Sequence, residues 1–234
     1  FIGYQAGYSN TTGSGNDSNH AVVGHRALYS NTTGQFNSAL GHSALYSNTT
    51  GSNNTAVGYQ ALYSNTTTSR NTAIGWEAAV SNTTGSGVTA FGATALRSNT
   101  TGKSNIAIGT WDSTDGITGA MYYNTTGSSN VAVGTGALSA NTTASSNTAV
   151  GYKALYANTT GTGNTAVGNQ SGLANTTSSY STYLGYVAGE STTGEKNTFL
   201  GQGAGSSVTT GADNTIIGRF NGNQSSLDIR TSSG

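Results

Sequence analysis

The chain of 234 residues has neither cysteine nor proline, and only 7% of its residues are charged. Without cysteine there are no disulfides, no thiolate nucleophiles and no cysteine-ligated zinc. The absence of proline suits a chain in which nearly every backbone N–H is needed for a hydrogen-bond ladder. Eight basic and eight acidic residues leave no net charge, which disfavours nucleic acid and anionic membranes as partners. No apolar run approaches the roughly 18–20 residues that span a bilayer.

Material for catalysis is also scarce. Glycoside hydrolysis needs two carboxyl groups on either side of the scissile bond, and only Glu77 and Asp112 come near such an arrangement. No nucleophile triad, phosphate loop or metalloprotease motif is present. His25 and His42 share a position in the repeat described below, but the pattern offers no third metal ligand. We therefore predict a protein that is not an enzyme and has no cofactor.

What the chain does have is a repeat. A large apolar residue is followed by glycine thirteen times, and nine of the twelve spacings between those glycines are seventeen residues. One unit, at 54–70, reads Asn-Thr-Ala-Val-Gly-Tyr-Gln-Ala-Leu-Tyr-Ser-Asn-Thr-Thr-Thr-Ser-Arg. A short fixed period indicates structural units that cannot bury their apolar faces alone and must stack on their neighbours. The pattern predicts an elongated rod.

The large apolar residue before the glycine is present in every unit, which indicates an interior column. We predict a solenoid core made of Val23, Leu40, Val57, Ile74, Phe91, Ile108, Val133, Val150, Val167, Leu184, Leu200 and Ile217. The position before it is usually alanine, and the one before that is usually threonine. Such alternation over a few residues is typical of a short strand with two different faces.

A second apolar stretch follows the glycine, as at 59–63, and the remainder of the unit is polar and turn-forming. We therefore predict an all-β protein, a parallel β-solenoid of the flat, two-strand β-roll type, with about 17 residues per turn and about 13 turns. At about 4.8 Å per turn the rod is roughly 60 Å long. Its thin core and the small alanine side chains predict self-association, about a threefold axis or as a filament. The alternative is a monomeric roll whose alanines pack against its own second strand.

The sequences Asn-Thr-Ala-Val-Gly at 54–58 and Asn-Thr-Ala-Ile-Gly at 71–75 resemble the repeats of YadA-like trimeric autotransporter adhesin heads. That resemblance implies a left-handed, homotrimeric β-roll, although the period here is longer. The complete unit is also similar to repeats in phage tail-fibre proteins that end in a self-cleaving intramolecular chaperone. The repeat itself predicts a solenoid over residues 1–223. The resemblance implies that residues 224–234 are a junction to a downstream region that is missing from this sequence.

The motif Asn-Thr-Thr recurs ten times in the same phase, and each occurrence is an acceptor sequence for N-glycosylation. Two interpretations remain open: an exposed ridge that carries glycans, or a ladder of asparagine amides stacked from coil to coil. The asparagines are Asn10, Asn31, Asn48, Asn65, Asn82, Asn99, Asn124, Asn141, Asn158 and Asn175.

Aromatic residues also recur in phase. Tyr8, Tyr29, Tyr46 and Tyr63 share one column, and Tyr4, His25, His42, Tyr59 and Trp76 share another. Such columns either stack on sugar rings of a cell surface or stack on one another.

Two insertions interrupt the period, near 16–19 and at 110–118. The second carries Trp111, Asp112 and Asp115, and a bulge on a uniform rod is a candidate recognition site. A solvent loop without function is the alternative.

Taken together, these features predict a non-enzymatic structural fibre shaft that is extracellular, on a cell surface or on a virion. Its expected partners are copies of itself, and covalent or cell-surface glycans. One alternative is an adhesin or receptor-binding fibre that recognises glycans. A second is an ice-binding solenoid that uses its threonine columns.

Overall fold

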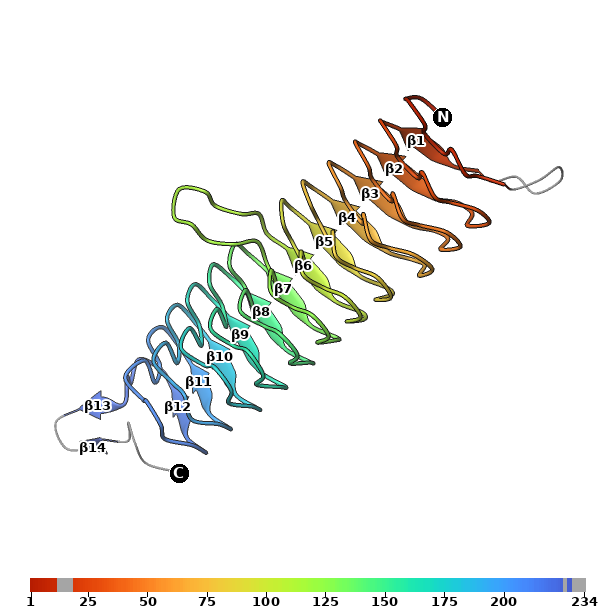
Figure 1. The fold of residues 1–234 in the computed structure, drawn as a ribbon. Coiled ribbons are helices and arrows are strands. Elements are labelled where there is room, and N and C mark those ends of the chain that lie inside the picture. Colours follow the sequence, from red (N-terminus) through yellow and green to blue (C-terminus); the bar gives the residue numbers. More distant parts are fainter. Residues whose placement is uncertain (12–18, 225–226, 229–234) are drawn as a thin grey trace.

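The computed structural model describes residues 1–11, 19–224 and 227–228, and in it the chain forms one long stack of coils (Figure 1). The stack contains twelve strands of three residues each. They are β1 (Ala21–Val23), β2 (Ser38–Leu40), β3 (Thr55–Val57), β4 (Thr72–Ile74), β5 (Thr89–Phe91), β6 (Ile106–Ile108), β7 (Val131–Val133), β8 (Thr148–Val150), β9 (Thr165–Val167), β10 (Thr182–Leu184), β11 (Thr198–Leu200) and β12 (Thr215–Ile217).

These strands form a single parallel sheet in sequence order. Each residue pairs with its equivalent in the next coil, so that Val57 lies beside Ile74 and Ile74 beside Phe91. An isolated parallel bridge between Ile2 and Val23 adds a further coil at the N-terminal end. The predicted fold class, an all-β parallel solenoid with about 17 residues per turn, is confirmed.

After β12 the chain leaves the parallel sheet. The strands β13 (Asn223–Gln224) and β14 (Leu227–Asp228) pair antiparallel with each other. Most of the predicted junction at 224–234 lies outside the described residues, and so do residues 16–18 of the first insertion.

The second side of each coil is not the strand that we predicted. Within the coil at 54–70 only Thr55–Val57 is strand, and residues 59–64 form consecutive turns. Gln60 and Leu62 have φ values of 54° and 52°, so left-handed residues alternate with ordinary ones. Both backbone N–H groups still bond to neighbouring coils, Gln60 to His42 at 3.0 Å and Leu62 to Ala78 at 3.1 Å. The hydrogen-bond ladder therefore continues without an extended backbone.

The recurring glycine closes the sharp bend after each strand. Gly58 has a φ of 132°, where side chains are rarely accommodated, and a Cβ there would lie 2.4 Å from the carbonyl oxygen of Gly75. Because the coils are stacked in register, the same close approach recurs along the rod. This packing explains the glycine period in the sequence.

The predicted core column is stacked as expected but lies on the wrong side of the sheet. All twelve of its members point outward: Val23, Leu40, Phe91, Ile108, Leu184, Leu200 and Ile217 are exposed, and Val57, Ile74, Val133, Val150 and Val167 are partly exposed. The middle residue of each strand, such as Ala56 or Ala73, is fully buried instead. A parallel strand of three residues can direct only its middle side chain inward, and the narrow coil has room there only for alanine in most units.

Leucine and alanine fill the remaining apolar interior in most coils. Near the C-terminal end the large side chain comes from the strand, and the position that leucine has elsewhere is glycine. Most coils combine a small strand residue with a leucine such as Leu155. In the later coils the strand residue is Tyr183 or Phe199, and the leucine position of the same coil is Gly189 or Gly205. Gly172, in the coil just before Tyr183, also replaces leucine. A Cβ on Gly172 would lie 2.6 Å from the Tyr183 ring. The aromatic ring therefore occupies the space that leucine fills elsewhere.

Candidate functional site

The asparagines of the Asn-Thr-Thr motifs lie inside the coil. Nine of the ten, from Asn31 to Asn175, have no exposed surface, and Asn10 is partly buried at the N-terminal end. The Nδ2 atom of Asn141 donates to Asn124 Oδ1 at 2.7 Å and to the Ala144 carbonyl at 3.1 Å. N-glycosylation joins the sugar to this nitrogen, and both of its hydrogens are already used. The nine buried positions therefore do not form an exposed ridge, and the amide ladder is present from Asn10 to Asn158.

A second buried column of amides lies just before the strands. Asn54 Oδ1 accepts a hydrogen bond from the backbone N–H of Asn71 at 3.0 Å, and the bond recurs in most coils. His20 takes this position in the first full coil, where its Nδ1 accepts from the N–H of Asn37 at 3.1 Å. Burial lowers the pKa of His20 below its usual value of 6.5, so the neutral ring is favoured. Half of the coil interior is thus polar and hydrogen-bonded.

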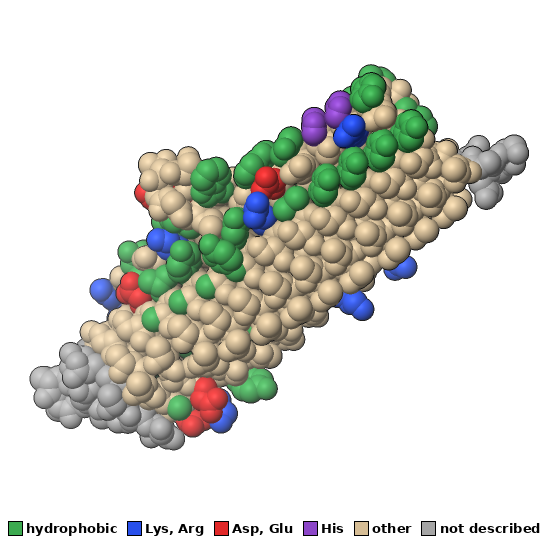
Figure 2. All heavy atoms as spheres, in the orientation of Figure 1, with side chains coloured by type: hydrophobic (Ala, Val, Ile, Leu, Met, Phe, Trp, Pro, Cys, Tyr) green, Lys and Arg blue, Asp and Glu red, His purple; other side chains and the backbone are tan. Residues whose placement is uncertain are grey.

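The aromatic columns stack on themselves. Tyr29 and Tyr46 have ring centroids 5.1 Å apart with planes inclined by 4°, and His25 and His42 are 4.8 Å apart. Figure 2 shows this apolar stripe along one edge of the rod, from the N-terminal end to the projecting loop. The broad face below it carries uncharged polar side chains. The self-stacking interpretation is confirmed for Tyr8 to Tyr63 and for Tyr4 to Tyr59, where each ring stacks on the next.

The second insertion projects from the rod as a short hairpin beside β6 and β7 (Figure 1). Asp112 and Ile117 form its closing antiparallel bridge, with N–H···O distances of 2.8 and 3.0 Å. Asp112 Oδ1 accepts from the N–H of Thr114 at 2.9 Å, which holds the turn. Asp115 is exposed at the tip, and Ile117 is buried at the base.

Trp111, at the foot of this hairpin, covers a gap in the aromatic column. The column passes from Tyr59 to Trp76 and is then interrupted by Ala93. The backbone N–H of Trp111 bonds to the carbonyl of Ala93 at 3.1 Å, and its ring approaches Trp76 with centroids 6.3 Å apart and planes inclined by 29°. The two rings are therefore tilted toward each other and leave a gap beside them.

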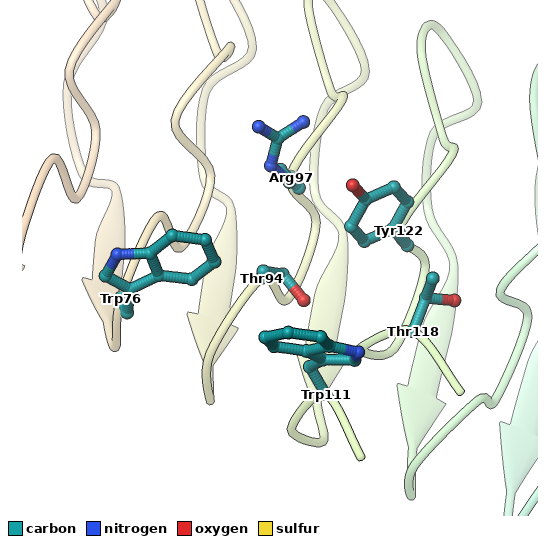
Figure 3. A pocket seen from close by; sticks show the side chains of 6 residues that line it. All are labelled: Trp76, Thr94, Arg97, Trp111, Thr118 and Tyr122. Atoms are coloured by element: carbon teal, nitrogen blue, oxygen red, sulfur yellow. The ribbon is translucent and has the colours of Figure 1, made fainter. Parts of the chain in front are cut away.

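The gap forms a pocket of about 230 Å³. Figure 3 shows Trp76 on one side, Trp111 opposite Arg97 and Tyr122, and Thr94 between them. The sixth lining residue is Thr118, whose hydroxyl is hydrogen-bonded to Ser139. The pocket thus combines three aromatic rings with three hydroxyls, of Thr94, Thr118 and Tyr122, and one guanidinium group.

The charge in the pocket is balanced. Arg97 Nε donates to Glu77 Oε2 at 2.7 Å, and the Glu77 side chain is only 13% exposed. This hydrogen bond raises the pKa of Arg97, which stays a cation. The guanidinium carbon lies 5.6 Å from the centre of the Tyr122 ring, within cation–π distance. Because Glu77 pairs with Arg97 and Asp112 holds the hairpin turn, the two carboxylates have structural partners and do not form the pair that hydrolysis needs.

Thr94 stands out among the lining residues. It is 3% exposed, and its Oγ1 has no hydrogen-bond partner. A hydroxyl buried in this way costs free energy, about 1–3 kcal/mol where nothing compensates. The only other such atom in the described residues, Asn158 Oδ1, lies where Asn175 turns toward the Tyr183 hydroxyl and the ladder breaks. Nothing in the described part of the protein compensates for burial of the Thr94 hydroxyl without a partner.

The sequence identified Trp111 but not most of its neighbours. Asp112 and Asp115, predicted with it, do not line the pocket. Thr94, Arg97 and Tyr122 were missed because each occupies a position whose residue type varies between coils. Interruption of the aromatic column by Ala93, next to the insertion, was the available signal.

Two findings bear on other classes of site. In the described part of the chain, no three His, Cys, Asp or Glu side chains lie close enough together to hold a metal ion. Within the same residues no helix has the length and apolar character to cross a bilayer.

Comparison of the chain with protein-family models, with curated proteins and with solved structures finds no match.

Proposed function

We propose that this protein is a structural fibre shaft that assembles with copies of itself through the outer face of its parallel sheet. The observation that carries the proposal is the aliphatic column along that face. Phe91 is 53% exposed and Val23 is 42% exposed, and the column continues through all twelve strands. Parallel sheets are almost always covered on both faces, and here the coil covers only one.

The size of this face is sufficient for a specific contact. Twelve strands at about 4.8 Å make it about 55 Å long, and two outward side chains per strand make it about 10 Å wide. Each chain then offers about 550 Å², and a pair of faces would bury about 1,100 Å², close to the lower end of specific interfaces. Only 7% of the residues are charged and the chain has no net charge, so little charge repulsion opposes contact between identical chains.

The route to assembly differs from the one that the sequence suggested. The alanine column cannot receive another chain, because Ala56 and its equivalents are buried in their own coil. The aliphatic residues take that role in this proposal. The threefold arrangement rests on the resemblance to YadA-like heads, and a location outside the cell or on a virion rests on that resemblance and on the one to phage tail fibres.

The test is the molar mass of the intact chain in solution, measured by light scattering at micromolar concentration. We expect three chains per particle. Val150→Lys places a charge on the outer face and should release monomers, whereas Thr143→Lys, on the exposed corner that precedes β8, should not. A wild-type chain that is monomeric at all accessible concentrations would contradict the proposal.

The same face supports a second candidate, ice binding. The first strand residue also points outward, and it is threonine in most coils, as in Thr55, Thr72 and Thr89. Equivalent hydroxyls are therefore repeated at the spacing of the strands, about 4.8 Å. Thermal hysteresis of the monomer, abolished by Thr72→Lys, would favour this function. An oligomer without thermal hysteresis favours the shaft.

A further inference from the structure

We propose that the pocket between Trp76, Trp111 and Tyr122 binds a single neutral hexopyranose unit of a glycan. This activity is separate from assembly of the shaft, because the pocket belongs to one chain and lies at the inserted hairpin. It would make the rod a carbohydrate-binding fibre at one defined position.

The aromatic lining suits the apolar face of a sugar. A pyranose ring presents C–H groups on its faces and hydroxyls around its edge, so it stacks on an aromatic face while its rim makes hydrogen bonds. Trp76 and Trp111 are 44% and 47% exposed, whereas two rings packed together in the interior would be buried. In the tyrosine column the rings lie 5.0–5.2 Å apart and cover one another. The gap at Ala93 leaves tryptophan surface that no neighbouring ring of the column covers.

The polar groups are placed for a ligand with hydroxyls. The Thr94 hydroxyl lies at the centre of the lining in Figure 3 and has no partner in the protein. The oxygen has less than 1 Å² of accessible surface, so a sugar hydroxyl would reach it only after a small shift of the lining side chains. Once there, it can both donate to and accept from the Thr94 hydroxyl, which would recover the free energy that the buried group costs. Arg97 uses Nε for Glu77 and also interacts with the Tyr122 hydroxyl, and its guanidinium group has further N–H donors at the rim.

Charge and size narrow the ligand further. Arg97 is already paired with Glu77, so the pocket has no uncompensated cation to select a carboxylated sugar. Its volume of about 230 Å³ lies below the range of about 300–1,000 Å³ that is typical of sites for drug-sized ligands. One neutral ring, at the end or along the edge of a glycan, is the ligand class that fits both properties.

Binding can be followed by intrinsic fluorescence, because the chain has only two tryptophans and both line the pocket. The intact protein is titrated with methyl glycosides of glucose, galactose and mannose and of N-acetylglucosamine. Methyl glucuronide and N-acetyltryptophanamide serve as acidic and aromatic probes. We expect saturable binding of at least one neutral glycoside, with a Kd in the millimolar range that is usual for so small a contact.

Thr94→Val is the decisive variant. Val187 occupies the equivalent position of its own coil, so the backbone accepts valine there. The variant should bind the glycoside about fivefold to tenfold more weakly, as expected for one lost hydrogen bond to a buried group. It should also unfold at the same or a higher denaturant concentration, because a buried unpartnered hydroxyl is removed. A residue with only a structural role would not combine these two effects.

Two further variants complete the test. Trp111→Ala should abolish binding, which the remaining fluorescence of Trp76 and calorimetry both monitor. Tyr186→Ala removes an exposed ring from the same column as Trp76 at a distant coil, and should leave binding unchanged. The proposal is overturned if no neutral glycoside binds at up to 100 mM, a limit about a hundredfold above the expected Kd. It is also overturned if Thr94→Val binds as well as wild type, or if only the acidic or the aromatic probe binds.

Discussion

The asparagine ladder and the glycosylation signal can be separated by two substitutions in one motif. Asn141→Ala and Thr143→Ala both destroy the acceptor sequence at 141–143. Only the first removes a buried amide, because the Thr143 side chain is exposed at the corner of the coil. If asparagine serves the fold, the two variants differ strongly in stability.

The size of the difference follows from the hydrogen bonds that are lost. Asn141→Ala leaves Asn124 Oδ1 without its donor and removes the acceptor of Asn158 Nδ2, at 2.7 and 3.1 Å. The Ala144 carbonyl keeps a second donor, Asn130 Nδ2 at 2.9 Å. Two buried polar groups each lose a hydrogen-bond partner, which costs about 1–3 kcal/mol for each group. Asn141→Ala should therefore lower the free energy of unfolding by about 2–6 kcal/mol. Thr143→Ala should change it by no more than about 0.5 kcal/mol.

The assay is guanidinium unfolding followed by circular dichroism, together with native-state hydrogen exchange. Stacked repeats need not unfold in one step, so exchange of the amides in the two adjoining coils gives the local free energy directly. We expect faster exchange near Asn124 and Asn158 in Asn141→Ala alone. Equal effects of the two substitutions, or none from Asn141→Ala, would refute the ladder as a source of stability.

Three further predictions concern the interior. Gly58→Ala should prevent close stacking of the coils and lower the denaturant midpoint markedly, because both φ and the facing carbonyl exclude a Cβ. Gly172→Leu and Tyr183→Ala should each destabilise the protein, by about 1–3 and 3–5 kcal/mol. The double variant removes the ring that a leucine at position 172 would meet, so its loss should be smaller than the sum in a double-mutant cycle. Stability should fall as the pH drops below about 6.5. The pKa of His20 is lowered in the folded chain, so the unfolded chain binds the proton more readily. Weaker protection of the Asn37 amide in acid, measured relative to its intrinsic exchange rate and absent in His20→Asn, would demonstrate this.

The sequence predicted the architecture because the period itself is a structural constraint. Gly58 and its equivalents mark a bend that only glycine permits, and their spacing gives the length of the coil. The pattern could not decide which face of the strand is inside. In a three-residue strand either Val57 or Ala56 can be the residue that points into the coil, and the prediction took valine because it is larger. The coil is too narrow for a larger inward side chain in most units, so alanine is the buried residue, and the period does not reveal this width.

The functional residues were less predictable for a related reason. The Asn-Thr-Thr motif is both a good turn and an acceptor sequence, and only the burial of residues such as Asn141 separates the two. The pocket depends on departures from the repeat that have meaning only together: Ala93 opens the column, Trp111 covers it and Thr94 lies beneath. Contacts between residues that far apart in sequence follow from the stacking, not from the motif.

The central claim is that successive units lie directly on one another along the whole rod. Since the chain has no native cysteine, spin labels can be attached to pairs of introduced cysteines at exposed corner threonines. Double electron–electron resonance, with labelled chains diluted into unlabelled ones, should give about 19, 24 and 29 Å for Thr67 paired with Thr143, Thr160 and Thr177. These values correspond to a constant increment of about 4.8 Å for each added coil. Distances that do not increase by this step would contradict the stacked solenoid.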